Sequence, residues 1–328
     1  CHGLPIEWKI EEQYRAKGLD KDAVDTVAFR QECRRFAEGW VDIQREEFKR
    51  LGVTGDWADP YLTMDYHAEA VIAAEFMRFL MNGSLYQGSK PVMWSPVEKT
   101  ALAEAEVEYH EHQSHQVWVA FKVVRGGRAE WVQPARDIPT FSGTSETGVF
   151  TQYFKDFRGA RVLIWTTTPW TIPQNRAVAF NPSIAYGLYE VTGRPVESNA
   201  TIGARYLVAD KLAEAVFAQA KLDGSMVRRL RGVSADELGA LTLAHPFDRM
   251  DGANGEWDYP VPLLPGEHVT DDAGTGFVHT APSHGDDDYQ LYLRFRDQHL
   301  ELRMTHNIME DSSFRVDLPV FGADARRE

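Results

Sequence analysis

The sequence contains almost no cysteine. Cys1 and Cys33 are the only two in 328 residues, and they lie too far apart to form a Cys-x-x-Cys pair of the kind that binds zinc. Two cysteines also provide no disulfide framework such as stabilises small secreted proteins. The composition therefore excludes zinc-ribbon and disulfide-rich classes and favours a reducing compartment, which we expect to be the cytoplasm.

Long apolar runs are also missing. A helix that crosses a bilayer needs about 20 consecutive apolar residues, and no stretch of the chain approaches that length. Residues 1–7, Cys-His-Gly-Leu-Pro-Ile-Glu, have neither the charged nor the apolar region of a signal peptide. We therefore expect a soluble globular protein with no membrane partner, and its length favours two domains.

Positive charge is scarce. The chain has 35 Lys and Arg against 49 Asp and Glu, a formal net charge of −14. Because phosphate contacts need clustered basic side chains, this balance argues against a freestanding nucleic-acid-binding protein. Any such contact must be local. The one dense basic stretch is Arg-Arg-Leu-Arg at residues 228–231, which is also typical of a solvated basic turn.

The first part of the chain has a helical pattern. Apolar residues spaced by three and four share one helix face, and Gly52 follows as a C-cap: Phe29, Cys33, Phe36, Trp40 and Ile43. A second helix is predicted over residues 66–82, where Gly83 ends it.

After residue 113 the apolar period falls to two, which predicts a half-buried strand over residues 117–123. Further short strands are predicted at 161–166, 177–180, 185–191, 205–209 and 276–279. Asp210 is expected to cap a helix that runs through residue 221, and another helix is expected to open at Asp286. The predicted fold class is α+β, with a β-barrel-like domain carrying inserted helices over 114–328, preceded by a mostly helical part over 1–113.

Two stretches carry most of the chemical information. Residues 165–175 read Trp-Thr-Thr-Thr-Pro-Trp-Thr-Ile-Pro-Gln-Asn, and residues 274–288 read Gly-Thr-Gly-Phe-Val-His-Thr-Ala-Pro-Ser-His-Gly-Asp-Asp-Asp. Each places hydroxyls, aromatic rings or carboxylates in a turn after an apolar, β-branched run. Polar groups presented from a rigid frame in this way are typical of substrate sites.

These two stretches resemble the two walls of the editing pocket of the isoleucyl-tRNA synthetase family. The resemblance continues through residues 1–7, 51–57, 60–65, 90–94 and 101–109. Many relatives carry a Cys pair after the position of Trp94, but residues 95–98 here are Ser-Pro-Val-Glu, so we expect no metal there. The valyl and leucyl enzymes carry Thr-Thr-Arg-Pro where residues 167–170 read Thr-Thr-Pro-Trp, which favours the isoleucyl branch.

Two signatures of class I synthetases do not occur in this sequence. The His-Ile-Gly-His and Lys-Met-Ser-Lys-Ser motifs bind ATP and stabilise the adenylation transition state in that class. The resemblance therefore implies a fragment that does not activate amino acids. Residues 1–113 would be part of the Rossmann-type catalytic domain, and residues 114–328 would be the editing domain, also called connective peptide 1. Editing would need no cofactor, whereas the complete enzyme uses ATP and Mg²⁺.

The implied activity is hydrolysis of the ester in valyl-tRNA(Ile), and valyl-adenylate is a second candidate substrate. Isoleucine and valine differ by one methylene, worth only about 1–3 kcal/mol in a hydrophobic pocket, a limit for which isoleucyl-tRNA synthetase is itself the usual example. A second, smaller pocket hydrolyses valyl esters and rejects isoleucyl-tRNA by size. The implied partners are the acceptor end of tRNA(Ile), the mischarged valine and the rest of the synthetase chain.

The resemblance also implies roles for individual residues. Asp288 would bind the α-ammonium of the substrate, because a charge-assisted hydrogen bond is about twice as strong as a neutral one. Asp286 and Asp287 are instead expected to stabilise the start of a helix through its dipole. Thr166, Thr167 and Thr168 would hold the ester and the terminal adenosine and orient the attacking water through side chains and backbone amides.

Trp170 and His279 complete the predicted site. Trp170 would form a wall of the pocket and His279 would discriminate by size; the alternatives are a core aromatic ring and a structural hydrogen-bond donor. Thr171 is expected to make only local backbone hydrogen bonds. The predicted catalytic set is Thr166, Thr167, Thr168, His279 and Asp288, with Trp170 added for substrate binding and no general base assigned.

Two other functions remain open. A metal-dependent hydrolase would need ligands such as His279, His284 and Asp286–Asp288, or His110, His112 and His115, although neither set has a familiar zinc spacing. A non-catalytic module that binds the tRNA 3′ end is the second. A Ser-His-Asp hydrolase is disfavoured because no Gly-x-Ser-x-Gly motif is present.

Overall fold

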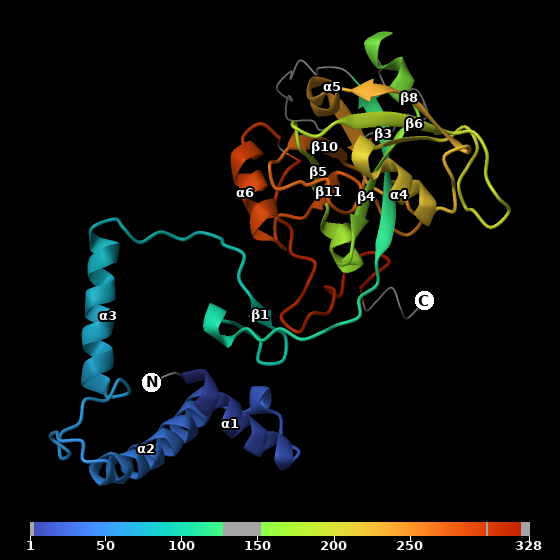
Figure 1. Cartoon of the computed structure of the whole chain (residues 1–328). Coiled ribbons are helices and arrows are strands. Elements are labelled where there is room, and N and C mark those ends of the chain that lie inside the picture. Colours follow the sequence, from blue (N-terminus) through green and yellow to red (C-terminus); the bar gives the residue numbers. More distant parts are fainter. Residues whose placement is uncertain (1–2, 127–151, 300, 323–328) are drawn as a thin grey trace. The chain divides into compact units, whose positions relative to one another are not determined.

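The computed structural model describes residues 3–126, 152–299 and 301–322. The contacts between residues divide it into two compact units, Cys1–Ser89 and Lys90–Glu328, both drawn in Figure 1. Residues 90–113 thus belong with the second unit by their contacts. The functional boundary between residues 113 and 114 stays a prediction.

The first unit consists of helices. They are α1 (Gly3–Ala16), the short 3₁₀ helix η1 (Lys21–Ala23), α2 (Thr26–Arg50) and α3 (Tyr66–Met81). Aspartates begin the two longer helices: the Asp25 carboxylate accepts from the backbone N–H of Ala28 at 2.9 Å, and Asp65 caps α3 in the same manner. The helices predicted in this region are confirmed by α2 and α3, whereas α1 was not predicted.

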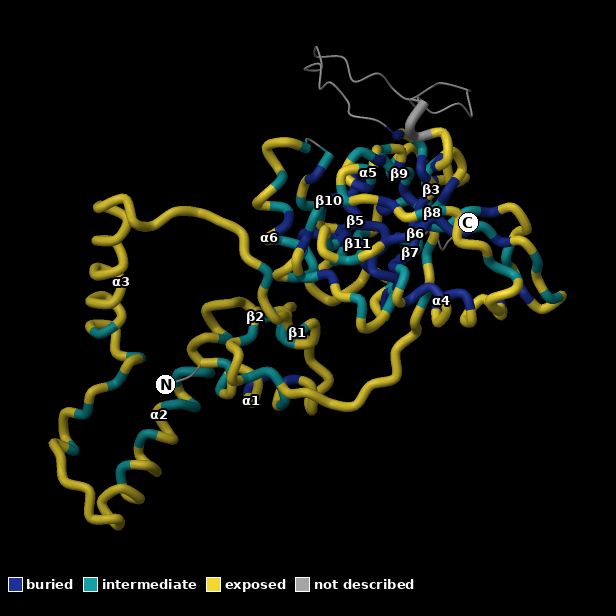
Figure 2. The backbone as a smooth tube through the Cα atoms, turned by 45° about the horizontal axis from the view of Figure 1, so that its top comes forward, coloured by how far each residue is buried: buried dark blue, intermediate teal, exposed yellow. Residues whose placement is uncertain are grey.

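Among the described residues of the first unit, the buried side chains all lie in α1. Ile10 and Tyr14 are buried, and the Tyr14 ring lies edge-on to Phe29 with 5.9 Å between ring centroids. Neither α2 nor α3 has a buried residue, and both are drawn in the exposed and intermediate colours in Figure 2. The predicted helices are therefore present, but their apolar side chains find few partners within this unit.

The second unit is built around one mixed sheet of nine strands in the order β11-β5-β10-β9-β3-β4-β7-β6-β8. In chain order the strands are β3 (Val117–Gly126), β4 (Arg161–Thr166), β5 (Ala177–Phe180), β6 (Tyr186–Val191), β7 (Arg205–Ala209), β8 (Val227–Val233), β9 (Leu241–Ala244), β10 (Pro260–Pro265) and β11 (Phe277–Thr280). The pairs β5–β10 and β4–β7 are parallel and the others are antiparallel. A separate small hairpin pairs β1 (Trp94–Ser95) with β2 (Thr100–Ala101).

The sheet curls towards itself. Strand β11, at one edge, also contacts β4 in the middle of the strand order, and the segment leading into it contacts β7 through the bond from Ala209 N–H to the Thr275 carbonyl at 2.9 Å. Gly276 permits this approach, because its φ is +80° and a Cβ there would lie 2.3 Å from that of Ala209. The α+β prediction is confirmed, and the described strands form a curved sheet rather than a closed barrel.

The second unit also contains short helices, which lie before, between or after the strands in the chain. They are η2 (Glu104–Glu106), η3 (Gln152–Phe157), η4 (Pro169–Gln174), η5 (Asp210–Leu212), α4 (Ala213–Gln219), α5 (Ala235–Gly239) and α6 (Asp286–Phe295). The helix predicted to open at Asp286 is confirmed. The capping role predicted for Asp210 is wrong, because its carboxylate accepts hydrogen bonds from Tyr189 at 2.6 Å and Arg229 at 2.7 and 2.9 Å, which leaves α4 without a side-chain cap.

The core of the second unit lies between the faces of the curled sheet, where Figure 2 shows the buried segments gathered. Its largest cluster has fully buried side chains from many strands, among them Phe121, Ile164, Leu188, Leu207, Leu243 and Leu263. Within the described residues, none of the helices combines the length and the apolar character that a bilayer crossing requires.

Candidate functional site

The first predicted wall is a turn at the end of β4, here called the threonine turn (residues 166–168). The Thr166 hydroxyl accepts from the backbone N–H of Thr168 at 3.0 Å, and the two side-chain oxygens lie 3.1 Å apart. Thr166 is buried, whereas Thr167 and Thr168 are exposed. The amide of Thr168 is thus used inside the turn and its hydroxyl lies beside that of Thr166, while Thr167 and Thr168 are the exposed residues of the turn.

A 3₁₀ helix follows the threonine turn directly and turns Thr171 inward. Thr171 is 4% exposed, and its Oγ1 donates to the Thr168 carbonyl at 2.8 Å. The same oxygen lies 2.7 Å from Nε2 of His279. On the other side of the ring, Nδ2 of Asn175 lies 3.1 Å from Nδ1 of His279. Both ring nitrogens of His279 are therefore engaged by η4 or by its C-cap.

Strand pairing explains why two stretches a hundred residues apart meet here. Strand β5 begins two residues after Asn175 and pairs antiparallel with β11, with His279 opposite Val178 and Thr280 opposite Ala177. The backbone N–H of Arg176 extends this ladder by donating to the Thr280 carbonyl at 2.8 Å. The part of the second predicted wall that forms β11 is thus paired with the strand that continues the first wall.

His279 is a buried, uncharged ring. It is 8% exposed, and burial lowers its pKa to about 4. The ring is therefore neutral at pH 7 and offers only a small edge to solvent. Because each nitrogen already has a hydrogen-bond partner, the geometry gives no support for His279 as a general base.

Asp288 lies in the first turn of α6, three residues after the N-cap, Gly285. Its Oδ2 accepts from the backbone N–H of Ala281 at 2.9 Å, which fastens the loop after β11 to the helix. Burial raises the pKa of this carboxyl to about 6. Among the described residues no cation pairs with it, whereas Asp286 and Asp287 are exposed. Asp288 is therefore the one member of the aspartate run that faces the interior.

Trp170 stands beside the same loop. Its ring is 45% exposed and meets His284 edge to face with 5.0 Å between centroids. Burial lowers the pKa of His284 to about 4, so this neighbour is also neutral at pH 7. Trp170 is thus a surface aromatic held at one edge rather than a core residue.

The sets considered as metal ligands do not come together. Among the residues that the structure describes, no group of three or more His, Cys, Asp or Glu side chains is placed to hold a metal ion. His110, His112 and His115 are exposed in an irregular segment. The side chains of the metal-dependent alternative therefore form no ligand cluster in this part of the chain.

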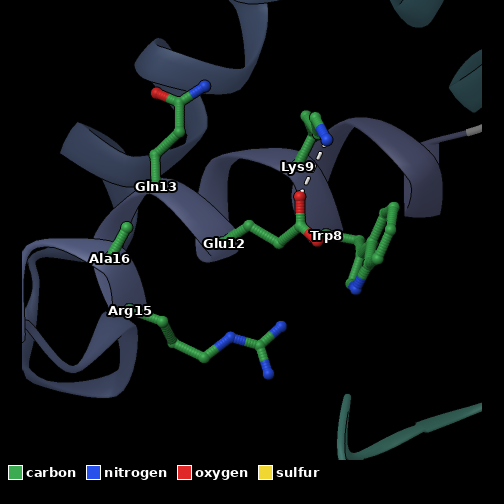
Figure 3. A pocket seen from close by; sticks show the side chains of 6 residues that line it. All are labelled: Trp8, Lys9, Glu12, Gln13, Arg15 and Ala16. Carbon is green, nitrogen blue, oxygen red and sulfur yellow. Dashed lines mark hydrogen bonds and ion pairs between the residues drawn. The ribbon is translucent and has the colours of Figure 1, made fainter.

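A hollow of about 720 Å³ lies elsewhere, along helix α1 of the first unit, and is drawn in Figure 3. Its lining comes from one helix: Trp8, Lys9, Glu12, Gln13, Arg15 and Ala16. Ligand sites are usually enclosed from several sides, and a hollow bounded by a single helix is not. None of the predicted site residues lines it.

The basic stretch at residues 228–231 is a strand, β8, and not a turn. Each of its arginines pairs with a carboxylate: Arg228 with Glu190, Arg229 with Asp210 at 2.7 Å, and Arg231 with Glu237 at 2.9 Å. The positive charge of this stretch is therefore balanced locally, which removes it as a nucleic-acid-binding patch of unpaired charge.

The structure connects the threonine turn to His279, and Asp288 bonds to Ala281 in the loop just after that histidine. Two residues outside the predicted set take part in these contacts. Thr166, Thr168 and His279 are connected through Thr171, which had been expected to bond only to the local backbone. Asn175 was not singled out at all. Its signal in the sequence is an amide side chain two residues before an apolar strand, and buried polar side chains are normally hydrogen-bonded.

The sequence matches the protein family described as "tRNA synthetases class I (I, L, M and V)" over residues 1–296. The chain belongs to this family. Among its curated relatives, isoleucine–tRNA ligase of Ruegeria pomeroyi is 58% identical over 98% of this chain and 30% of that protein. The ligase of Caulobacter vibrioides is 52% identical, covering 89% and 27%, and that of Mesorhizobium japonicum is 48% identical, covering 99% and 32%.

This class I synthetase chain thus spans roughly 30% of the length of the relatives it matches, and the predicted resemblance to isoleucyl-tRNA synthetases is confirmed. Solved structures show weaker similarity. The cytosolic leucyl-tRNA synthetase editing domain of P. falciparum is 15% identical with a TM-score of 0.34, over 42% of this chain and 47% of that one. That of P. knowlesi is also 15% identical with a TM-score of 0.34, over 44% and 53%.

Proposed function

We propose that this chain carries the editing site of an isoleucyl-tRNA synthetase and hydrolyses the ester of valyl-tRNA(Ile). The observation that carries the proposal is the hydrogen bond between Thr171 and His279 at 2.7 Å. It joins the threonine turn to the strand that leads to Asp288, which supports assigning the groups needed for ester hydrolysis to one site. The identity of the relatives supports the same assignment.

Asp288 would bind the α-ammonium of the mischarged valine. Its carboxylate is half-buried and has no cationic partner among the described residues, while burial, with a smaller contribution from the charge of Asp287, raises its pKa to about 6. An ammonium beside it would lower that pKa again and favour the ionised form. An unpaired carboxylate in a partly dehydrated place is thus suited to a ligand that brings its own positive charge.

The threonine turn would hold the ester and the terminal adenosine. Its exposed hydroxyls at Thr167 and Thr168 are available to orient the attacking water and to stabilise the developing oxyanion. The Thr168 amide is not available, because it already donates to Thr166. Side-chain hydroxyls rather than that amide would therefore provide the hydrogen bonds.

Trp170 and His279 would set the size of the pocket. The half-exposed ring of Trp170 provides an apolar surface beside the loop that leads to Asp288. The neutral ring of His279 provides bulk without charge. Both would limit the space for a side chain, which is how a site that accepts valine rejects isoleucine.

The proposal extends to the whole protein from which such a chain would come. Residues 114–328 would be the editing domain and residues 1–113 part of the catalytic domain. The complete enzyme would join isoleucine to tRNA(Ile) in the cytoplasm with ATP and Mg²⁺, and editing would need neither. The acceptor end of tRNA(Ile), its valyl ester and the rest of the synthetase would be the partners.

The test is deacylation of valyl-tRNA(Ile) by the purified 328-residue chain. The Asp288→Asn variant keeps an oxygen to accept from Ala281 but removes the charge. We expect it to lose about 30-fold to 1,000-fold in kcat/KM, equivalent to about 2–4 kcal/mol. The matched control is Asp286→Asn on the exposed side of the same helix turn, for which we expect a change of less than about twofold.

Three results would contradict the proposal. Equal losses at both aspartates would assign the whole run to the stability of helix α6. Binding of tRNA(Ile) without any deacylation would favour a non-catalytic module for the tRNA 3′ end. Activity that disappears with a strong chelator and returns with a divalent metal would favour a metal-dependent hydrolase.

A further inference from the structure

The hydrogen bonds around His279 have a fixed direction. Nδ2 of Asn175 donates to the Ala177 carbonyl at 2.8 Å and lies 3.1 Å from Nδ1 of His279. An amide nitrogen has two hydrogens and accepts nothing, so Nδ1 of the ring must be the acceptor. In a neutral imidazole the proton then resides on Nε2.

That proton has one acceptor in the structure. Nε2 lies 2.7 Å from the Thr171 hydroxyl, so the ring donates and Thr171 accepts. The hydroxyl in turn donates to the Thr168 carbonyl at 2.8 Å. The result is a one-way chain from Asn175 through His279 and Thr171 to the threonine turn, in which every donor has an acceptor.

We propose that Thr171 is a positioning residue for editing: its hydroxyl, shared between the His279 ring and the Thr168 carbonyl, holds the threonine turn at a fixed distance from the second wall. This inference rests on the proposed function, because it assigns a role within the same site. Thr171 does not contact the substrate, since it is 4% exposed. It acts through the two neighbours whose places it sets.

The reason to expect an effect is geometric. Without the hydroxyl, the Nε2 proton of His279 is a buried donor with no acceptor. Because an unsatisfied buried donor costs free energy, we expect the ring to rotate away from its present plane. The Thr168 carbonyl keeps only the backbone N–H of Thr171, at 3.0 Å. The exposed hydroxyls of the turn then lose their fixed position relative to Asp288, and small misplacements of reacting groups are costly in rate.

The test compares three variants of the 328-residue chain. Thr171→Val keeps the shape and removes the hydroxyl, and Thr171→Ser keeps the hydroxyl. The matched control is Ser198→Ala, which removes a hydroxyl from an equally buried side chain that donates to the Ala220 carbonyl at 2.6 Å and belongs to neither predicted wall. Each is assayed for deacylation of valyl-tRNA(Ile), and the side-chain nitrogens of the histidines are followed by ¹⁵N NMR.

For the unaltered chain we expect the His279 spectrum of a neutral ring protonated on Nε2. In Thr171→Val we expect that signal to shift or broaden and kcat to fall about tenfold to a hundredfold, with KM within about threefold because the ammonium contact remains. Thr171→Ser should recover kcat to within about threefold. Ser198→Ala should leave both the His279 signal and the kcat per folded molecule unchanged.

Two results would overturn the inference. One is a Thr171→Val chain with unaltered kcat and an unaltered His279 signal. The other is a Thr171→Ser chain that loses as much activity as Thr171→Val, because the hydroxyl would then not be the cause. If the unaltered chain has no deacylase activity, the proposed function fails, and the NMR comparison alone decides whether Thr171 holds the ring.

Discussion

The two units of this chain use their apolar side chains in opposite ways. In α3 of the first unit, Phe76 and Phe79 are 57% and 56% exposed. In the second unit, Phe121 and Phe180 are 0% and 2% exposed. Both pairs come from segments whose apolar pattern correctly predicts the secondary structure. The pattern therefore predicts a helix or a strand, and burial depends on whether another element covers the apolar face.

This difference in burial between the two units also indicates which of them determines folding and which presents a free apolar surface. The second unit has its own core and contains all the candidate site residues. The first unit has a helix, α3, that is apolar on most sides, a pattern typical of helices covered by further protein. Its own described residues do not cover it. Changes in the second unit are thus expected to alter folding and hydrolysis, whereas changes on α3 leave both nearly unaltered.

The largest expected effect is on the free energy of unfolding. Phe121→Ala removes a fully buried ring from the main core cluster, and we expect a loss of about 3–5 kcal/mol. Phe76→Ala makes the same chemical change on exposed α3 and should cost less than about 1 kcal/mol. Urea unfolding followed by tryptophan fluorescence measures both. Equal losses would show that α3 has a partner in this chain and would end the contrast between the units.

The second prediction concerns how the free energy of unfolding of the second unit changes as the pH falls. Burial lowers the pKa of His245 to about 3 and that of His279 to about 4, below the unfolded value of about 6.5. As the pH falls from 6.5 towards 4, these rings bind protons in the unfolded chain but not in the folded one. The free energy of unfolding is therefore highest above pH 6.5 and decreases towards pH 4, by on the order of a few kcal/mol per ring.

His245→Gln should reduce the slope of the unfolding free energy against pH between 6.5 and 4 by up to about one proton. The control is His67→Gln, in the first unit, where the ring is exposed and no change in slope is expected. Identical slopes for all three chains would mean that the buried ring of His245 does not govern acid unfolding of the second unit.

The third prediction is a change in selectivity, and it tests whether the site lies in the second unit alone. His279→Ala removes the ring that would exclude the extra methylene of isoleucine. We expect the ratio of isoleucyl-tRNA to valyl-tRNA hydrolysis to rise about tenfold, the value of roughly one methylene. Phe76→Ala should leave the ratio unchanged. A constant ratio in His279→Ala, whatever the absolute rates, would assign the ring a structural role only.

The smallest expected effect involves charge. Arg228 is exposed and paired with Glu190, and an exposed ion pair contributes less than about 1 kcal/mol. Arg228→Gln should therefore alter stability by no more than this and the affinity for tRNA(Ile) by less than about twofold. Filter binding at two salt concentrations measures the affinity. A tenfold loss with a reduced salt dependence would make β8 a direct phosphate contact.

The elements that the sequence predicted are those with a clear local period. Strands β3 and β4 and helix α6 begin within a residue of their predicted starts, because alternation or an aspartate run marks them. Strands β8 and β10 were not predicted: arginines in one and prolines in the other are typical of turns. They are strands because neighbouring strands provide their hydrogen bonds, and a single sequence does not display such distant partners.

In the candidate site too, residues within local motifs were predicted, whereas a residue with a distant partner was not. The threonines, His279 and Asp288 were predicted as site residues because they occur in recognisable motifs, and their roles stay a prediction. The role inferred for Thr171 was not, since a β-branched residue after a proline turn predicts only local bonds. Its partner is 108 positions away. Only the pairing of β5 with β11 brings the two together, and this pairing is a property of the folded sheet.

The bond between Asp288 and Ala281 has a consequence for the kind of cation that fits. Oδ2 already accepts a backbone N–H at 2.9 Å, which leaves Oδ1 as the oxygen without such a partner. A guanidinium binds a carboxylate best with two parallel hydrogen bonds, one to each oxygen, whereas an ammonium is a compact charge whose three N–H donors rotate and can place a single hydrogen bond on one oxygen. The loop that closes on α6 thus makes Asp288 a better receptor for a primary amine than for a forked cation.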